Sequence, residues 1–426
     1  MSTEGLPSPR HYQRVPVRAV NSLLRLMQPL GIGRADLSEQ DLIAAARKQA
    51  GLHEFGDESF LEPMRIILRG LEEESDLNPL GRHLARQSLV RLLRNRLLAN
   101  DLLQRHPEIL ERELPPPVVV MGLGRSGTTR LHRLLAADER FLHLKSWESV
   151  HPVPWPESYG ASPDPRETNI EQALKAVLYM SPQIGAVHPL GANEVEEELG
   201  LLQHGFSSQI FEILSKLPTF AEWLMTHEQL GAYEYMVQLL KIISWFRGDP
   251  PGKPWVLKTP QHMQDLDSLI KVFPGARLVF THRDPVKAVG SVCSTAWNSM
   301  VRDTDTLDPH VIGADWLQKT DRMLRKTLQL RDTVIPAAQV YDVRYEDLSS
   351  DWRAVMAGVY DWLGMPFTGE TQSAMQAWLS VNAQHKHGAH KYQLEDFGLS
   401  AEQVDTRLAY YRQRFEIPRE TIVRTS

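Results

Sequence analysis

The segment from Val118 to Leu135 joins a run of β-branched residues to a glycine-rich stretch and then to a helical pattern. This order predicts a buried strand, a tight turn from Gly122 to Thr129 and a helix that begins directly after the turn. Such a turn aims backbone N–H groups and the positive end of a helix dipole at an anion, usually a phosphate. The segment is therefore a candidate phosphate loop.

This loop departs from the loop of nucleotide triphosphatases at one position. Those loops read G-x-x-x-x-G-K-[ST], and Gly122 and Gly127 keep the glycine spacing. Thr128 stands where the lysine belongs, and Arg125 supplies the cation inside the loop. The loop can hold a phosphate, but it lacks the lysine that serves a β/γ-phosphate pair.

A second polar cluster follows another short apolar segment, Trp255-Val-Leu257. Lys258 ends this predicted strand, and Thr259-Pro260 can open the next helix. In open parallel sheets, ligands bind at the carboxyl ends of the strands. We therefore expect Lys258 to lie at the same edge of the sheet as the phosphate loop.

A third cluster follows the predicted strand at residues 277–281. Arg283 ends it, while Asp284 and Pro285 suit the N-cap and the first position of a helix. Ser291 lies further along that helix. A planar arginine fork with a hydroxyl group suits a second, separate phosphate.

The elements that must position these residues alternate between strands and helices. Predicted strands at 118–122, 255–257, 277–281 and 339–343, with a further short one at 141–145, favour an α/β fold with a parallel sheet flanked by helices. Helical patterns cover 15–106 and most of 167–248, including 193–203 and 233–246, whereas the proline-rich stretch 151–166 is expected to be irregular. We predict a helical N-terminal region at 1–112, and an α/β domain at 113–426 with a helical insertion at about 165–250.

Composition sets the remaining bounds. The chain of 426 residues has a net charge of −6, which gives no sign of a nucleic-acid partner. Its single cysteine, Cys293, fits a buried helix position and a reducing compartment. The first residues lack the apolar core of a signal peptide, and no run of about 18 apolar residues could span a membrane. We expect a cytoplasmic enzyme, while a peripheral membrane contact and an oligomer stay open.

The order of the clusters resembles that of the sulfotransferases that use 3′-phosphoadenosine-5′-phosphosulfate (PAPS). The chain reads R-S-G-T-T after the first strand, then a strand that ends in lysine. It then reads F-P-G-A-R-L-V-F-T-H-R-D-P, with a serine eight residues beyond the arginine. The resemblance covers roughly residues 115 to 365. It implies a P-loop-like fold and transfer of a sulfuryl group to a hydroxyl group, with adenosine 3′,5′-bisphosphate as the product.

The resemblance also implies residue roles. The 5′-phosphosulfate would be held by Arg125, Ser126, Gly127, Thr128 and Thr129, and the 3′-phosphate by Arg283 and Ser291. Lys258 would assist the transferring group, and Glu148 would be the catalytic base. Cytosolic members have a histidine after the strand lysine (K-T-H), whereas this chain has Pro260 there. The site is therefore similar to the bacterial-type and protein-tyrosine sulfotransferases, with arginine, glutamate and lysine.

Several residues keep two interpretations. Glu148 is either the base or a surface carboxylate, and His132 and His151 are rival bases. Tyr345 either touches the nucleotide or packs in the core. Lys391, with Lys386 and His390, either closes over the nucleotide or lies in a solvated loop.

Two charged sets have a simpler expectation. Glu194, Glu197 and Glu198 are expected on one solvated helix face, with a role in orienting an acceptor or Lys258 as the alternative. The arginines between 84 and 103 (Arg86, Arg91, Arg94 and Arg96) are expected on a solvated face as well. No convincing metal site is apparent, and no metal is expected.

These features favour a PAPS-dependent sulfotransferase that acts on a hydrophobic small-molecule or lipid acceptor. The alternative enzyme is a P-loop kinase or nucleotide hydrolase, and a non-catalytic nucleotide-binding protein is a third hypothesis. The missing loop lysine, and the absence of an aspartate for Mg²⁺ at a second strand end, argue against the kinase.

Overall fold

The computed structural model describes residues 6–30, 34–187, 191–382 and 392–420. The chain divides into two compact units. The helical unit comprises Met1–Leu114, Leu144–Gly252 and Thr295–Leu307, and the sheet unit comprises Pro115–His143, Lys253–Ser294 and Asp308–Ser426. The domain boundaries predicted from the sequence stay a prediction.

The sheet unit contains four parallel strands in the order β2-β1-β3-β4. Their bounds are β1 Val118–Gly122, β2 Val256–Lys258, β3 Arg277–His282 and β4 Val340–Arg344. All four were predicted from the sequence to within one residue at each end. The predicted α/β class with a parallel sheet is confirmed.

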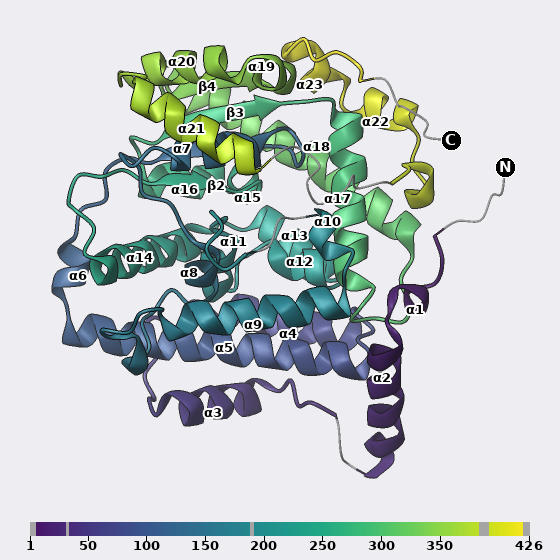
Figure 1. Ribbon diagram of the computed structural model, residues 1–426. Helices are drawn as coiled ribbons and strands as arrows, with labels where there is room; N and C mark the ends of the chain where they lie inside the picture. Colours follow the sequence, from purple (N-terminus) through teal and green to yellow (C-terminus); the bar gives the residue numbers. More distant parts are fainter. Residues whose placement is uncertain (1–5, 31–33, 188–190, 383–391, 421–426) are drawn as a thin grey trace. The chain divides into compact units, whose positions relative to one another are not determined.

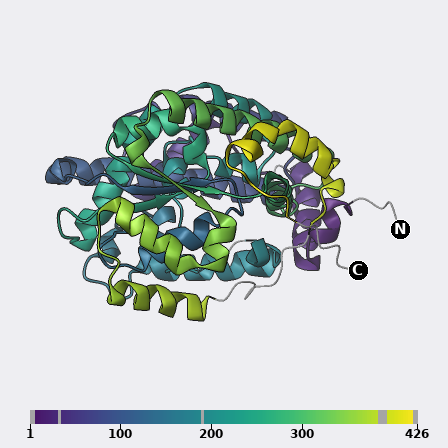
Figure 2. The same cartoon turned by 90° about the horizontal axis from the view of Figure 1, so that it is seen from above.

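Both faces of β1 are buried, which explains its continuous apolar run. On one face, Val118 and Val120 pack in a core cluster with Leu131 and Leu135 of α7 and Met356 of α20. On the other face, Val119 and Met121 are equally buried, and α15 packs against the strand. Figure 2 shows helices on both sides of the strands.

The helices of the sheet unit follow the strands in sequence. They are α7 Thr128–Ala136, α15 Gln261–Gln264, α16 Leu266–Val272, α17 Pro285–Met300, α18 Pro309–Thr333, α19 Tyr345–Ser350, α20 Trp352–Leu363, α21 Gly369–Val381, α22 Ala401–Arg407 and α23 Ala409–Arg414, with 3₁₀ turns η3 Ala337–Gln339 and η4 Glu395–Phe397. Helix α17 continues past Ser294 into the helical unit. Cys293 on α17 is buried, as predicted.

The helical unit is built around the long helix α5, which contacts α2, α3 and α11 (Figure 1). Its helices are α1 Pro9–Tyr12, α2 Val15–Met27, α3 Glu39–Ala50, α4 Leu61–Glu73, α5 Pro79–Arg105, α6 Glu108–Glu111, α8 Ser146–Val150, α9 Pro165–Met180, α10 Ile184–Val187, α11 Leu199–His204, α12 Ile210–Leu214, α13 Pro218–Thr226 and α14 Leu230–Arg247, with 3₁₀ turns η1 Gln28–Leu30 and η2 Pro156–Ser158. The predicted irregular stretch 151–166 contains little more than η2.

The predicted strand at 141–145 is wrong. Leu142 makes only an isolated bridge with Trp255, through backbone bonds from Leu142 N to Pro254 O and from Val256 N to Leu142 O, both 2.8 Å long. Directly afterwards, at Leu144, the chain passes into the helical unit. No second ladder contact extends the bridge within the part of the chain that the structure describes.

The predicted helix at 193–203 is wrong in its first half, because α11 begins only at Leu199. Residues before it bond to the segment around Lys145 instead: Ser146 N donates to Glu194 O and Glu196 N to Leu144 O. This backbone pairing excludes a helix there. The acidic run therefore shares no helix face, and Glu198 at its end is buried rather than solvated.

The expected solvated arginine face of α5 is wrong for Arg96, which is buried in the helical unit. The other three arginines of this set are partly exposed. Arg96 is 1% exposed and lies between the rings of Phe60 and Tyr235, 4.0 and 4.1 Å from their centroids. Its guanidinium donates to backbone carbonyls of His204 and Asp57. The other arginines contact Asp41 (Arg86), Val150 O (Arg91) and the Trp155 ring (Arg94). Stacking and carbonyl contacts let a cation sit in an apolar interior.

A buried hydrogen-bond network ties the segment after α7 to α20 in the sheet unit. The Tyr360 hydroxyl donates to Asp138 Oδ2 at 2.6 Å, and Arg140 binds the same carboxylate. Burial and the bond to Asp138 raise the pKa of Tyr360 above its ordinary value, so the hydroxyl remains a donor.

We expect Tyr360→Phe to lower the free energy of unfolding by about 1–3 kcal/mol, because a buried carboxylate loses one donor. Chemical unfolding measures the change, with Tyr159→Phe as the control, since Tyr159 is 50% exposed. Equal stability of wild type and Tyr360→Phe would contradict the role of this bond.

Candidate active site

The loop between β1 and α7 has the tight bend predicted from its glycines. Gly127, at φ 91°, lies in the left-handed region that glycine adopts without strain, and Arg125 adopts φ 66°. A Cβ atom at Gly122 would lie 2.3 Å from Thr281 Oγ1. Glycine at this position lets the end of β1 approach β3 closely.

The Ser126 side chain holds the loop in place. It is fully buried, and its hydroxyl donates to Leu123 O at 2.5 Å and lies 2.6 Å from Thr281 Oγ1. Its backbone N–H bonds to Leu123 O as well. In this structure the hydrogen bonds of Ser126 therefore stabilise the conformation of the loop.

The first turn of α7 offers backbone donors. The first helical bond runs from Leu131 N to Gly127 O, so the N–H groups of Thr128, Thr129 and Arg130 lie ahead of the intrahelical bonds. The positive end of the helix dipole lies at the same place. An anion beside this turn would interact with these N–H groups and with the positive end of the dipole.

Lys258 reaches the same turn from β2. Its Nζ donates to Thr129 Oγ1 at 3.2 Å, and the side chain is 2% exposed. The sheet register places Lys258 beside Val120 of β1. The expected meeting of the strand-end lysine with the loop is confirmed by this geometry.

Arg283 is clamped by a carboxylate from the far end of the chain. Its Nε and Nη2 donate to the two oxygens of Glu420 at 2.5 and 2.7 Å, and its Nη1 donates to Arg125 O at 2.7 Å. The guanidinium lies 3.8 Å from the centroid of the Tyr345 ring. Tyr345 thus contacts the arginine and, across it, the loop, rather than only the core.

Ser291 lies on α17, two turns after Arg283, and is buried. The preceding residue, Gly290, has no side chain, and a Cβ there would lie 2.4 Å from the Tyr392 ring. The Tyr392 hydroxyl donates to Lys287 O at 2.8 Å, and burial raises the pKa of Tyr392 to about 12. The sequence interpretation did not single out Tyr392. Lys391, Lys386 and His390 lie outside the described residues.

Glu148 lies in the helical unit, on α8, and is 2% exposed, so its interpretation as a surface carboxylate is wrong. Its Oε1 accepts a bond from Arg247 Nε at 2.6 Å, and its Oε2 accepts bonds from Arg247 Nη2 and, at 2.9 Å, from Lys145 N. Arg247 ends α14, far along the chain. The charge of the buried carboxylate is therefore compensated within its own unit.

Close backbone contacts fix α8. Trp147 N donates to Ala192 O, and Ser149 Oγ donates to Glu197 O. A Cβ atom at Gly200 would lie 2.1 Å from Ser149 Oγ, so glycine lets α11 approach α8. These contacts hold Glu148 in one orientation.

The two rival bases are buried as well. Burial, the charge of Lys258 and other neighbouring groups hold the pKa of His132 well below its ordinary value, and its Nε2 lies 3.2 Å from Val256 O. Burial and Arg91 lower the pKa of His151 to about 3, and its Nε2 lies 3.2 Å from Asn169 Oδ1. Imidazoles with such low pKa values are weak bases.

The sequence interpretation missed four residues of these clusters, and three of them have no recognisable local signal. Arg247 and Glu420 are paired through contacts between distant parts of the sequence, and Tyr392 follows a basic stretch without a motif. Arg130, which directly follows the loop threonines, has a buried Nε with no hydrogen-bond partner among the described residues. Only Arg130 could have been found, from its place in the first turn of α7.

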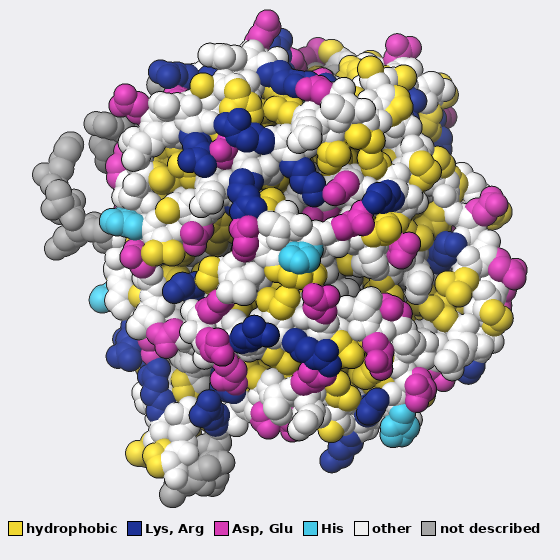
Figure 3. All heavy atoms as spheres, turned by 180° about the vertical axis from the view of Figure 1, so that it is seen from behind, with side chains coloured by type: hydrophobic (Ala, Val, Ile, Leu, Met, Phe, Trp, Pro, Cys, Tyr) yellow, Lys and Arg dark blue, Asp and Glu magenta, His cyan; other side chains and the backbone are white. Residues whose placement is uncertain are grey.

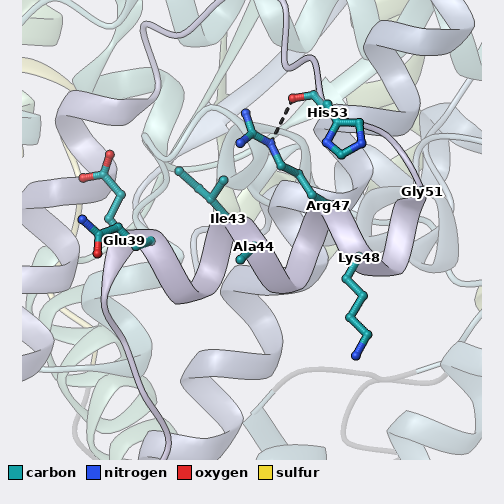
Figure 4. A pocket seen from close by; sticks show the side chains of 8 residues that line it. Glu39, Ile43, Ala44, Arg47, Lys48, Gly51 and His53 are labelled. Atoms are coloured by element: carbon teal, nitrogen blue, oxygen red, sulfur yellow. Dashed lines mark hydrogen bonds between the residues drawn. The ribbon is translucent and has the colours of Figure 1, made fainter.

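Other parts of the described chain add no competing site. The described residues contain no group of three or more His, Cys, Asp or Glu side chains that could hold a metal ion. Figure 3 shows acidic and basic side chains interspersed over much of the face it draws. A shallow depression runs along α3 in the helical unit (Figure 4) and includes none of the predicted site residues. It is lined by Glu39, Gln40, Ile43, Ala44, Arg47, Lys48, Gly51 and His53.

Comparison with known proteins identifies the fold. The chain is similar to two solved structures, sulfotransferase STF1 from Mycobacterium tuberculosis H37Rv and sulfotransferase STF9 from Mycobacterium avium. STF1 is 30% identical with a TM-score of 0.77, over 88% of this chain and 98% of that one. STF9 is 27% identical with a TM-score of 0.80, over 90% of this chain and 98% of that one.

A curated relative is similar at lower identity. Omega-hydroxy-beta-dihydromenaquinone-9 sulfotransferase Stf3 from Mycobacterium tuberculosis is 24% identical over 294 residues, which are 66% of this chain and 71% of that protein. Residues 116–369 match the sulfotransferase family as a whole. This match spans the phosphate loop, Lys258, Arg283 and Tyr345, and it sets aside the kinase and hydrolase alternative. The chain belongs to the sulfotransferase family.

Proposed function

We propose that this sulfotransferase takes its sulfuryl group from PAPS and transfers it to a hydroxyl group of a hydrophobic, lipid-like acceptor. The observation that carries the donor assignment is the clamp on Arg283. A carboxylate binds there through two parallel N–H···O bonds, which is the geometry that also suits a phosphate. Glu420 marks a place where an oxyanion fits.

The other residues of the sheet unit fit the donor as well. The N–H groups at the start of α7 and the side chain of Arg125 would hold the 5′-phosphosulfate. Arg283, with Ser291 behind it, would hold the 3′-phosphate after Glu420 has left. Tyr345 would help to hold the guanidinium in place through its ring contact. Arg130 joins this set as a further cation.

When bound, PAPS supplies an activated sulfuryl group and leaves as adenosine 3′,5′-bisphosphate. Lys258 is a buried cation that donates to the neutral Thr129 hydroxyl, and it would stabilise negative charge that develops beside the loop. Arg125 and the α7 amides would share that charge. By analogy with phosphoryl transfer, positioning and cations would do most of the work.

Glu148 is our candidate for the base that accepts the proton of the acceptor hydroxyl. Each carboxylate oxygen has two lone pairs. The bonds from Arg247 and Lys145 N occupy one lone pair of Oε1 and two of Oε2. Oε1 therefore keeps one acceptor position. Arg247 would hold the carboxylate in place while Oε1 accepts the proton.

The proposed class of acceptor is inferred from the relatives of this chain. Stf3 is named for a hydroxylated dihydromenaquinone, which is a lipid. No described helix of this chain is both long and apolar enough to cross a bilayer. We propose a hydrophobic alcohol or phenol as the acceptor of this chain.

The test is incubation of the purified protein with PAPS and a lipid extract, followed by mass spectrometry. We expect lipid products that have gained one SO₃ unit, and calorimetric binding of adenosine 3′,5′-bisphosphate without Mg²⁺. Binding of ATP with Mg²⁺, and none of the bisphosphate, would overturn the donor. Sulfation of polar metabolites alone would overturn the acceptor class.

We expect Arg283→Ala to weaken adenosine 3′,5′-bisphosphate binding by about 2–5 kcal/mol, because a buried charged contact is lost. Affinity for adenosine 5′-phosphate should change little, since that ligand lacks the 3′-phosphate. Calorimetry with both ligands measures the difference, and Arg344→Ala is the control because Arg344 is half exposed at a strand end. Equal losses for both ligands would contradict the 3′-phosphate assignment.

We expect Glu420→Gln to strengthen binding of the bisphosphate by roughly threefold to tenfold, because the ligand no longer displaces a paired carboxylate. Glu416→Gln is the matched control, since Glu416 is exposed and lies in the same tail. Weaker binding by Glu420→Gln would mean that the carboxylate assists the nucleotide instead.

We expect Glu148→Gln to lower turnover by roughly a hundredfold or more, the scale of a lost general base, while bisphosphate affinity stays unchanged. Glutamine can still accept the bond from Lys145 N. Steady-state kinetics measures the effect, and Glu198→Gln is the control because Glu198 is also buried in the helical unit. Full activity of Glu148→Gln would remove Glu148 from the mechanism.

A further inference from the structure

Helix α2 presents an apolar face to solvent. Val15, Ala19, Leu23 and Leu26 are spaced by four, four and three residues, so they lie on one side of the helix. Val15 is 67%, Leu23 58% and Leu26 76% exposed. Large apolar side chains are seldom so exposed together unless their surface meets a partner.

The opposite side of α2 attaches the helix to its own unit. Val17 and Asn21 are buried there, and Asn21 Oδ1 accepts a bond from Leu80 N at the start of α5 at 2.8 Å. The exposed apolar face is therefore not the face that packs on the helical unit. Among the described residues, α2 is thus attached to its unit by one side, and its apolar side remains exposed to solvent.

The charged side chains that α1 and α2 themselves contribute are all positive. Residues 6–30 contain four arginines and no Asp or Glu, although the whole chain has a net charge of −6. Arg18 and Arg25 are seven residues apart, on a stripe beside the apolar face. Arg25 and Arg10 share one partner, Asp305, whereas Arg18 has no ion-pair partner among the described residues. In Figure 3, Lys and Arg side chains gather at the lower left, near the grey residues that follow α2.

We propose that α1 and α2 dock this enzyme onto an anionic lipid surface, with α2 lying in the plane of the interface. A helix with an exposed apolar face and a cationic edge has the composition of such interfacial helices. Its apolar side chains enter the acyl boundary, and its arginines meet the lipid phosphates. Pairing of two copies through the same face would bring their arginine edges together, which opposes a dimer. The inference stands on α2 and does not require the proposed acceptor.

The test is co-sedimentation of the full chain with vesicles of phosphatidylcholine, with and without phosphatidylglycerol. We expect binding that needs the anionic lipid and weakens at high salt. Leu23→Ser with Leu26→Ser should reduce the partition coefficient at least about tenfold, because two apolar side chains no longer insert. Arg18→Gln should reduce it about fivefold, the equivalent of one basic residue at such a surface.

Leu110→Ser with Val334→Ser is the matched control, because both side chains are partly exposed outside α2. It should bind vesicles as the wild type does. Bisphosphate affinity and thermal unfolding show that the α2 variant is folded, and they also separate this test from the proposed function. No sedimentation of the wild type would overturn the proposal. So would a dimer in light scattering that the Leu23→Ser, Leu26→Ser variant abolishes.

Discussion

Positive charge gathered at the carboxyl ends of parallel strands is the constraint on which the sheet unit depends. Lys258 is buried at the end of β2, and Arg283 follows the end of β3, while the amides of α7 follow β1. Each cation needs an oxygen partner, because an uncompensated buried charge is costly. In this structure Thr129 and Glu420 provide the oxygens. The strands must be continuous and apolar, since their register alone brings these groups to one edge.

The sequence was sufficient where the signal was local. Val118–Gly122 is buried on both faces and reads as an unbroken apolar run, and the glycines that follow it specify the turn. Lys258 and Arg283 mark the ends of two strands, because a charged residue follows an apolar run there. Pro285 marks a helix start, because proline suits the first helical position. The predictions were wrong where contacts between residues far apart in the sequence determine the local structure. Arg96 is buried because Phe60 and Tyr235 surround it, and residues 193–198 pair with the segment at Lys145 instead of forming a helix.

The same distinction separates the parts of the candidate site. Arg125 and Thr129 could be predicted from one motif, because one loop contains both. The partners of Glu148 and Arg283 could not, since Arg247 and Glu420 lie about a hundred residues or more away in sequence and belong to no motif. Gly200 lets α11 approach Ser149 of α8, the helix that contains Glu148. A single sequence shows Gly200 but not which helix packs against it.

The two charge pairs also lie in different units. Glu148 and Arg247 both belong to the helical unit, and Arg283 and Glu420 both belong to the sheet unit. Each carboxylate is therefore compensated without a group from the other unit. In the proposed mechanism the donor replaces the Glu420 pair and leaves the Glu148 pair intact, so nucleotide affinity and the protonation state of the proposed base would be separate properties. Under this proposal the enzyme would hold its donor before an acceptor arrives without changing the charge around the proposed base.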